Sequence, residues 1–266
     1  MQLSLYGADD FANRPCLIYV HGFKGFKDWG FVPYAADYFA MRGFSFLTFN
    51  FSHNGIGKDP KQFTELDKFA RNTYSRELAE LREIIHLVAH SDFLGEYLRH
   101  PLGLVGHSRG GGLALLAAAS MPEIGAVCTW SAISGVDRYS KEVYEAWRKK
   151  GHHEVLNSRT GQVMRLGLPL LDDIERHAHN SLDILAATRK LRKPLLIIHG
   201  QKDETVPYYE AEQLNIFADP VSTQFRVVPQ AGHTYGAVHP FAGTTPALEQ
   251  VLEMTLDFAR QHLAGT

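Results

Sequence analysis

The segment from residue 102 to residue 120 constrains the fold more than any other part of the chain. Four apolar or small residues starting at Leu102 run into Gly106-His-Ser-Arg-Gly110, and an Ala- and Leu-rich stretch follows. This order predicts a buried strand, the turn G-x-S-x-G and a helix. Small residues two places on either side of Ser108 permit the strained turn that lifts a serine hydroxyl away from a sheet. Ser108 is therefore the candidate nucleophile; the alternative is a glycine-rich turn with an incidental serine.

Short apolar runs alternate with longer helical patterns along most of the chain, which predicts an α/β fold with a mostly parallel sheet and helices on both faces. The expected strands are Leu3–Tyr6 at an edge, Cys16–His21, Phe44–Phe51, Leu102–Gly106, Gly125–Ser131, Leu195–His199 and Gln224–Val228. The expected helices are Val32–Met41, Tyr74–Ala89, Gly110–Ser120, Tyr208–Phe217 and Pro246–Leu263.

Residues 136–185 depart from this alternation. The expected elements are a charged helix at Lys141–Lys150, two polar segments at His153–Asn157 and Gln162–Leu166 around a turn at Ser158–Gly161, and a short helix around Leu170–His179. Because no parallel-strand pattern occurs here, the stretch is predicted to be an insertion that forms a cap. The expected division is a core of residues 1–135 and 186–266 with a cap of residues 136–185.

An acid and a base follow two later strands in the order that a Ser-Asp-His triad needs. Asp203 comes after the strand that ends near His199, and His233 lies in a Gly-flanked turn after the last strand. Asp203 would orient His233, which would take the proton of Ser108. Three residues are alternatives: Asp137 and Glu204 for the acid, and His239 for the base.

An early glycine-rich loop, His21-Gly-Phe-Lys-Gly-Phe26, follows the strand at Cys16–His21. An oxyanion hole needs one backbone N–H from such a loop and one from the residue after the nucleophile. These would be the N–H groups of Phe23 and Arg109. The alternative is a glycine-rich turn that binds nothing.

Together these segments resemble the α/β-hydrolase superfamily over nearly the whole chain. The stretches that begin at His21, Gly106 and His199 are similar to the dienelactone-hydrolase and prolyl-oligopeptidase-like branch, and to small cinnamoyl (feruloyl) esterases, which carry a cap after the sixth strand. The resemblance implies a serine hydrolase with the triad Ser108, Asp203 and His233 and an oxyanion hole of Phe23 and Arg109. The chain departs at Asn50-Phe-Ser-His-Asn-Gly55, where many relatives have Asp-x-Arg-Gly-His-Gly.

Charge and hydropathy exclude other classes of function. The chain has 27 Lys+Arg, 29 Asp+Glu and a net charge of −2, so no basic surface for nucleic acid is expected. No signal peptide and no run of about 18 apolar residues is visible, which favours a cytoplasmic protein that does not enter membranes. Two cysteines could pair, but they are too few for a disulfide scaffold. The histidines at 152, 153, 177 and 179 lack a cysteine or a regular i, i+4 pair, so no metal is expected.

The expected activity is hydrolysis of a small-molecule carboxylic ester through an acyl-enzyme on Ser108, without a cofactor. Two alternatives stay open: an amide or peptide hydrolase that uses the same residues, and an idle hydrolase scaffold that only binds. A homodimer is also compatible with the sequence. The aromatic residues that could line a pocket are Phe23, Phe26, Trp29, Trp130, Trp147 and Tyr235, of which Trp130 is the one we place near the site.

Overall fold

The sheet is buried on both faces, as the apolar strands predict. In the computed structural model, which describes residues 1–59, 62–92, 97–158 and 160–264, every residue of β2 (Cys16–Val20) is buried. Alternate side chains enter different clusters, Ile18 packing on one face of the sheet and Tyr19 on the other. A strand with two covered faces needs apolar residues at successive positions, and this is what made the strands visible in the sequence.

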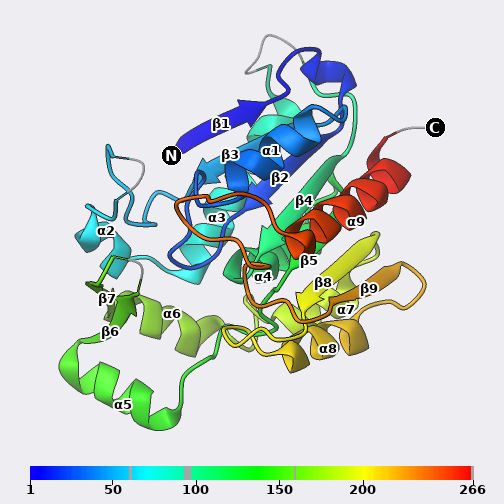
Figure 1. Ribbon diagram of the computed structural model, residues 1–266. Helices are drawn as coiled ribbons and strands as arrows, with labels where there is room; N and C mark the ends of the chain where they lie inside the picture. The colour runs from blue at the N-terminus through cyan, green and yellow to red at the C-terminus, as the bar shows by residue number, and fades with distance from the viewer. Residues whose placement is uncertain (60–61, 93–96, 159, 265–266) are drawn as a thin grey trace.

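Within the described residues, seven strands form the main sheet in the order β1-β3-β2-β4-β5-β8-β9 (Figure 1). Their bounds are β1 Gln2–Tyr6, β2 Cys16–Val20, β3 Ser45–Asn50, β4 Leu102–His107, β5 Ile124–Trp130, β8 Leu195–Gly200 and β9 Thr223–Val228. Among these described strands, β1 alone runs antiparallel to its neighbour, and the other pairs in this sheet are parallel. The predicted mostly parallel sheet is confirmed.

Helices cover both faces of the sheet. Helices α1 (Val32–Ala40) and α9 (Pro246–Leu263) pack on the near face in Figure 1. On the opposite face lie α3 Tyr74–His90, α4 Arg109–Ala118 and α8 Tyr208–Phe217. Among the described residues, three short elements were not predicted, because none is long enough to show a clear helical period: a 3₁₀ turn at Phe11–Asn13, α2 at Leu66–Ala70 and α7 at Ile184–Lys190.

The insertion lies between β5 and β8 and projects at the lower left of Figure 1. It contains α5 Lys141–Lys150, β6 His152–Asn157, β7 Gln162–Gly167 and α6 Leu168–His177. The two polar segments form an antiparallel hairpin, β6–β7, whose predicted turn includes Arg159, outside the described residues. In chain order the strand before the insertion is the fifth strand of the described residues, not the sixth. Helix α7 (Ile184–Lys190) crosses the predicted boundary between residues 185 and 186 and packs against α4 of the core.

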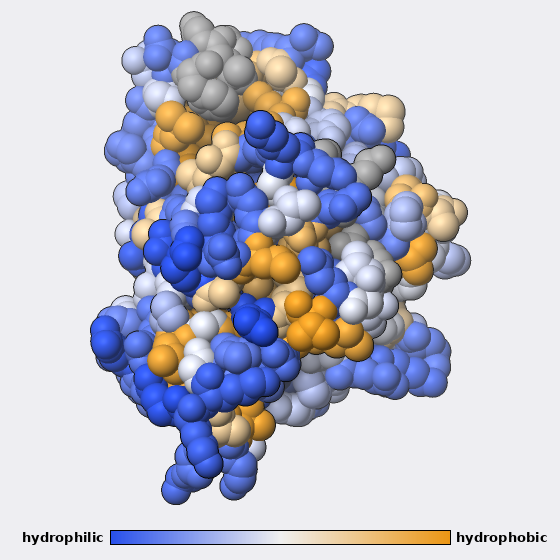
Figure 2. Space-filling model, turned by 90° about the vertical axis from the view of Figure 1, so that its left-hand side faces the viewer, coloured by the Kyte–Doolittle hydropathy of each residue, from blue (hydrophilic) through white to orange (hydrophobic). Residues whose placement is uncertain are grey.

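The face of the molecule in Figure 2 is mostly polar. Figure 2 shows the side that carries α2 and the hairpin; polar side chains cover most of it, and apolar ones form small separate groups. No helix in the described part of the chain is long and apolar enough to cross a membrane. Cys16 and Cys128 are buried and free, so they are not paired with each other. The predicted cytoplasmic location and homodimer stay predictions.

Candidate active site

Ser108 lies in the sharp turn between β4 and α4. Its backbone angles, φ 57° and ψ −122°, are strained for any residue other than glycine, and strained residues of this kind cluster at functional sites. The turn closes only because two flanking positions have no Cβ. A Cβ on Gly106 would lie 2.4 Å from the carbonyl oxygen of Gly110, and one on Gly110 would lie 2.0 Å from the carbonyl oxygen of Val20. The G-x-S-x-G spacing is therefore a packing requirement here.

Asp203 and His233 meet beside this turn. Asp203 follows β8 and His233 follows β9, and His233 Nδ1 lies 2.8 Å from Asp203 Oδ2. The other carboxylate oxygen accepts hydrogen bonds of 2.9 Å from the backbone N–H groups of Thr205 and Val206. Hydrogen bonds thus hold both oxygens of the Asp203 carboxylate, and this carboxylate fixes the orientation of the His233 ring.

The hydrogen bonds also control the charge of this acid. Burial opposes ionisation of Asp203, but the hydrogen bond from His233, the attraction of its ring and the N–H of Val206 together hold the pKa of the carboxyl below its usual value. Asp203 is therefore a carboxylate at neutral pH and accepts the Nδ1–H of His233. The other ring nitrogen of a neutral His233, Nε2, is then the one without a proton.

The three alternative residues lie in different settings. Asp137 is exposed and accepts a hydrogen bond of 2.6 Å from Tyr144, and Glu204 is exposed. His239 lines the same pocket as Ser108, but its Nδ1 accepts a hydrogen bond of 2.8 Å from the backbone of Gly30. Among the described residues, His233 is the one whose side chain forms a hydrogen bond with the Asp203 carboxylate. His199 Nε2 lies 3.5 Å from the same carboxylate oxygen, Oδ2.

Ser108 and His233 line one cavity of about 520 Å³, a volume typical of small-molecule sites. No direct hydrogen bond joins the two side chains in the described structure; such bonds are often long before a substrate binds. Of the aromatic residues considered from the sequence, Phe23, Phe26 and Trp29 line this cavity. The carbonyl oxygen of Trp130 accepts a 2.9 Å hydrogen bond from the N–H of Ser108, but the prediction that its side chain lies near the pocket is wrong. Its ring is fully buried under α9, where its Nε1 donates a 2.9 Å hydrogen bond to Thr255, because a strand end in a two-faced sheet is still covered.

Phe23 and Arg109 lie at Ser108, as the resemblance implies. Both residues line a second cavity of about 280 Å³ that also reaches Ser108. Within the described residues, neither backbone N–H donates a hydrogen bond to a protein group. One of these N–H groups lies in the early loop and the other at the start of α4, so both are available to a ligand.

The side chain of Arg109 holds these two segments together, which the sequence did not reveal. The buried guanidinium lies 4.5 Å from the centre of the Phe23 ring and 4.3 Å from that of Tyr74. It also forms a 3.6 Å ion pair with Glu77, which is buried on α3. Cation–π stacking on two sides and a buried counter-ion fix the plane of the guanidinium. The side chain of one candidate oxyanion residue is thus packed against the other.

A comparison with family models decides the family. The model of the prolyl oligopeptidase family matches residues 79–266, which include Ser108, Asp203 and His233. The chain belongs to the prolyl oligopeptidase family. The predicted resemblance to the prolyl-oligopeptidase-like branch of the α/β-hydrolases is confirmed, and the protein is a hydrolase of that superfamily.

Solved structures with the same fold have low sequence identity to this prolyl oligopeptidase-family hydrolase. Est1E from Butyrivibrio proteoclasticus, with bound ferulic acid, is 19% identical with a TM-score of 0.71, over 98% of this chain and 94% of that one. The monoacylglycerol lipase of Paleococcus ferrophilus is 15% identical with a TM-score of 0.67, over 98% of each chain. The dienelactone hydrolase of Anabaena variabilis is 17% identical with a TM-score of 0.58, over 94% and 87%. A search of the curated proteins found no match.

Two buried histidines support the site of this family member and were not singled out from the sequence. His107 Nε2 lies 2.9 Å from the carbonyl oxygen of His233, and its ring packs on that of His233. His21 Nδ1 lies 3.0 Å from the carbonyl oxygen of Gly22, while its Nε2 lies 3.4 Å from the N–H of Phe51. Burial lowers the pKa of His107 to about 3 and that of His21 to about 4, so both rings are neutral at pH 7.

These two histidines should make folding stability depend on pH. Below pH 6.5 the unfolded chain protonates both rings while the folded protein keeps them neutral, so stability falls as the pH drops from 6.5 toward 4. Each ring contributes up to about 1.4 kcal/mol per pH unit once the unfolded chain is fully protonated, so about 3 kcal/mol should be lost between pH 6.5 and pH 5. Urea unfolding at the two pH values measures this loss. His107→Gln should roughly halve this loss of stability. An unchanged pH dependence of stability in that variant would contradict the neutral state of the folded His107 ring.

Proposed function

We propose that this protein is a serine hydrolase that cleaves carboxylic esters through an acyl-enzyme on Ser108. The observation that carries the proposal is the 2.8 Å contact between His233 Nδ1 and Asp203 Oδ2, formed in the same pocket as a serine in a strained strand-to-helix turn. A nucleophile, a base and an acid that orients the base are the parts that acyl transfer needs.

In the first step, Ser108 Oγ attacks the ester carbonyl while His233 Nε2 takes its proton. Asp203 accepts the Nδ1–H and stabilises the imidazolium that forms. The carbonyl oxygen becomes an oxyanion, which the N–H groups of Phe23 and Arg109 would stabilise. Collapse of the tetrahedral intermediate breaks the bond to the alcohol oxygen, and His233 gives its proton to that oxygen.

In the second step, water replaces the alcohol. His233 removes a proton from the water as it attacks the acyl carbonyl, and the tetrahedral intermediate then releases the acid and restores Ser108 with the proton from His233. The neutral state of His107 matters here, because a second positive charge beside His233 would oppose formation of the imidazolium.

The substrate would be a small molecule with an apolar or aromatic part. The larger cavity has aromatic side chains in its wall, from Phe23, Phe26 and Trp29, and the smaller one also reaches Ser108. Two cavities that meet at the nucleophile fit the acyl and alcohol parts of an ester.

Asn157 and Ser158 at the hairpin turn also border the larger cavity. We therefore propose that residues 136–185 act as the cap, with the core formed by residues 1–135 and 186–266.

Peptide hydrolysis is the second candidate, because the matching family takes its description from an oligopeptidase. The same residues would cleave an amide, with the amine as the leaving group in place of the alcohol. Turnover of a matched pair of substrates, an aryl ester and the corresponding anilide, separates the two. We expect the ester to be cleaved and the anilide to be left intact; preferred cleavage of the anilide would favour the peptidase.

A fluorophosphonate probe followed by peptide mapping tests the proposal directly. The probe labels a serine only when a base and an oxyanion site activate it. We expect one phosphonylated peptide, with the label on Ser108. A native protein that takes no label would favour an idle scaffold that only binds.

Arg109 should act as a positioning residue for Phe23. Replacing it by Met keeps the backbone N–H and much of the side-chain volume but removes the planar charge stacked between Phe23 and Tyr74. We expect kcat to fall about 10-fold to 100-fold because the two N–H donors lose their fixed spacing, with KM changed less. Steady-state kinetics on an aryl ester measures the split, with the exposed Arg82→Met on α3 as the control. A rise in KM alone would contradict the positioning role.

A further inference from the structure

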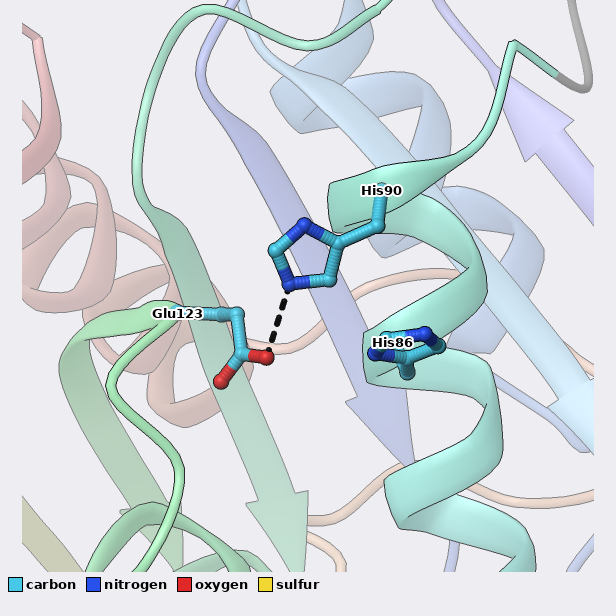
Figure 3. A group of neighbouring side chains, drawn as sticks. All are labelled: His86, His90 and Glu123. Atoms are coloured by element: carbon cyan, nitrogen blue, oxygen red, sulfur yellow. Dashed lines mark hydrogen bonds and ion pairs between the residues drawn. The ribbon is translucent and has the colours of Figure 1, made fainter.

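A group of metal-ligating side chains lies where α3 ends and β5 begins. His86 and His90 stand one turn apart on α3, and Glu123 directly precedes β5 (Figure 3). This i, i+4 pair lies outside the insertion, whose histidines are the ones considered above for a metal site. Side chains four residues apart on a helix are neighbours on its surface, which suits two ligands of one ion.

The ligand atoms are close to the spacing of a coordination shell. One atom from each side chain lies within 4.8 Å of the other two, and His90 Nε2 lies 2.9 Å from Glu123 Oε1. Ligands of a tetrahedral zinc ion lie roughly 3.3 Å apart, since each is about 2.0–2.1 Å from the metal. Both histidines are exposed, so small rotations about their side-chain bonds close the remaining gap and the ion can enter from solvent.

Glu123 is the anchored member of the group. Its side chain is only 14% exposed, and its second oxygen, Oε2, is buried and has no hydrogen-bond partner among the described residues. Among the described residues, His90 is the group that forms an ion pair with Glu123. The ammonium of Lys193 donates a hydrogen bond to the carbonyl oxygen of Met121 and acts on Glu123 by its charge, without an ion pair between them. Glu123 Oε1, the oxygen that faces His90 in Figure 3, is the atom placed to bind a cation, and a largely buried carboxylate with one unpartnered oxygen gains from such a charge.

We propose that His86, His90 and Glu123 bind Zn²⁺, with water at the fourth position. Two imidazoles and one carboxylate are a ligand set that zinc takes readily, whereas Mg²⁺ and Ca²⁺ prefer oxygen ligands. The ion would join the end of α3 to the start of β5. Ser108 donates its N–H to Trp130 at the other end of β5, about 20 Å away for a strand of this length. The site is thus separate from ester cleavage and would act on stability.

Thermal unfolding of the full chain tests the proposal. After treatment with EDTA and removal of the chelator, ZnCl₂ at a hundred times its Kd should raise Tm by about 5 °C, because the ion binds only the folded state. Calorimetric titration should give one saturable site. Co²⁺ in place of Zn²⁺ should give the visible absorption of a tetrahedral nitrogen and oxygen site.

Variants identify the ligands. His86→Gln and Glu123→Gln should each lose the Tm shift and the cobalt absorption. His179→Gln, which changes an exposed histidine elsewhere, should keep both. His233→Ala should also keep both, which excludes the active-site histidine as a ligand. The proposal is overturned if the wild-type chain shows no saturable zinc binding, or if His86→Gln and Glu123→Gln respond like the wild type. Cleavage of an aryl ester should not depend on zinc; a turnover that needs the ion would contradict the separation of the two sites.

Discussion

Replacing Ser108 by alanine should lower kcat for an activated ester by about 10⁵-fold to 10⁶-fold, with the fold intact. The loss is large because no acyl-enzyme can form without Oγ, and His233 then has no nucleophile to activate. The free N–H groups of Phe23 and Arg109 remain, so a small rate above that of water should persist. Steady-state kinetics, with circular dichroism to verify folding, measures the effect.

A control serine makes this result specific. Ser181 is exposed in the insertion, and Ser181→Ala should keep both wild-type turnover and fluorophosphonate labelling. Ser108→Ala should lose both. Turnover by Ser108→Ala within about tenfold of the wild type would refute the acyl-enzyme mechanism, since deleting the nucleophile of a triad costs orders of magnitude more.

Asp203→Asn should lower kcat by about 10⁴-fold. An amide in place of the carboxylate can donate to the His233 ring, which favours the tautomer with its proton on Nε2 and so removes the acceptor for the serine proton. The backbone N–H groups of Thr205 and Val206 still find an oxygen if the amide is suitably oriented, so the loop should keep its shape. Kinetics on an aryl ester at pH 7 measures the loss.

Asp137→Asn is the matched control for this variant. Asp137 is the other aspartate that the sequence offered as the acid, and it is exposed, with a hydrogen bond to Tyr144 rather than to a histidine. Its replacement should leave kcat within about threefold, as expected for a surface change. If Asp137→Asn were inactive and Asp203→Asn active, the acid would have to be assigned to the earlier strand.

The sequence predicted the sheet and the place of the site because both depend on local patterns. A strand buried on two faces needs successive apolar residues, and each predicted strand of the main sheet ends within one residue of its observed bounds. The turn around Ser108 needs glycines at two fixed positions, and the loops of Asp203 and His233 follow strands that the same apolar pattern reveals. Parallel order then brings these loops to one edge of the sheet.

The sequence could not predict contacts that depend on packing between distant segments. Nothing near Arg109 in the sequence indicates that Phe23, Tyr74 and Glu77 surround its guanidinium, because these residues come from other elements. Trp130 is the converse case. A strand end looks accessible in the sequence, and only the position of α9 buries the ring. The pairing of Glu123 with His90 likewise depends on how α3 lies beside the start of β5.

The contact between His107 Nε2 and the carbonyl oxygen of His233 joins residues 126 positions apart. Contacts between residues so far apart in the sequence form late in folding, because the chain between the two residues loses entropy before the contact can stabilise the fold. The turn that holds Ser108 needs only β4 and α4. His233 reaches its position beside Ser108 only after β8 and β9 have joined the sheet next to β5. During refolding, ester cleavage should therefore recover later than the circular-dichroism signal of the helices. Enzyme activity would then report when the sheet is complete.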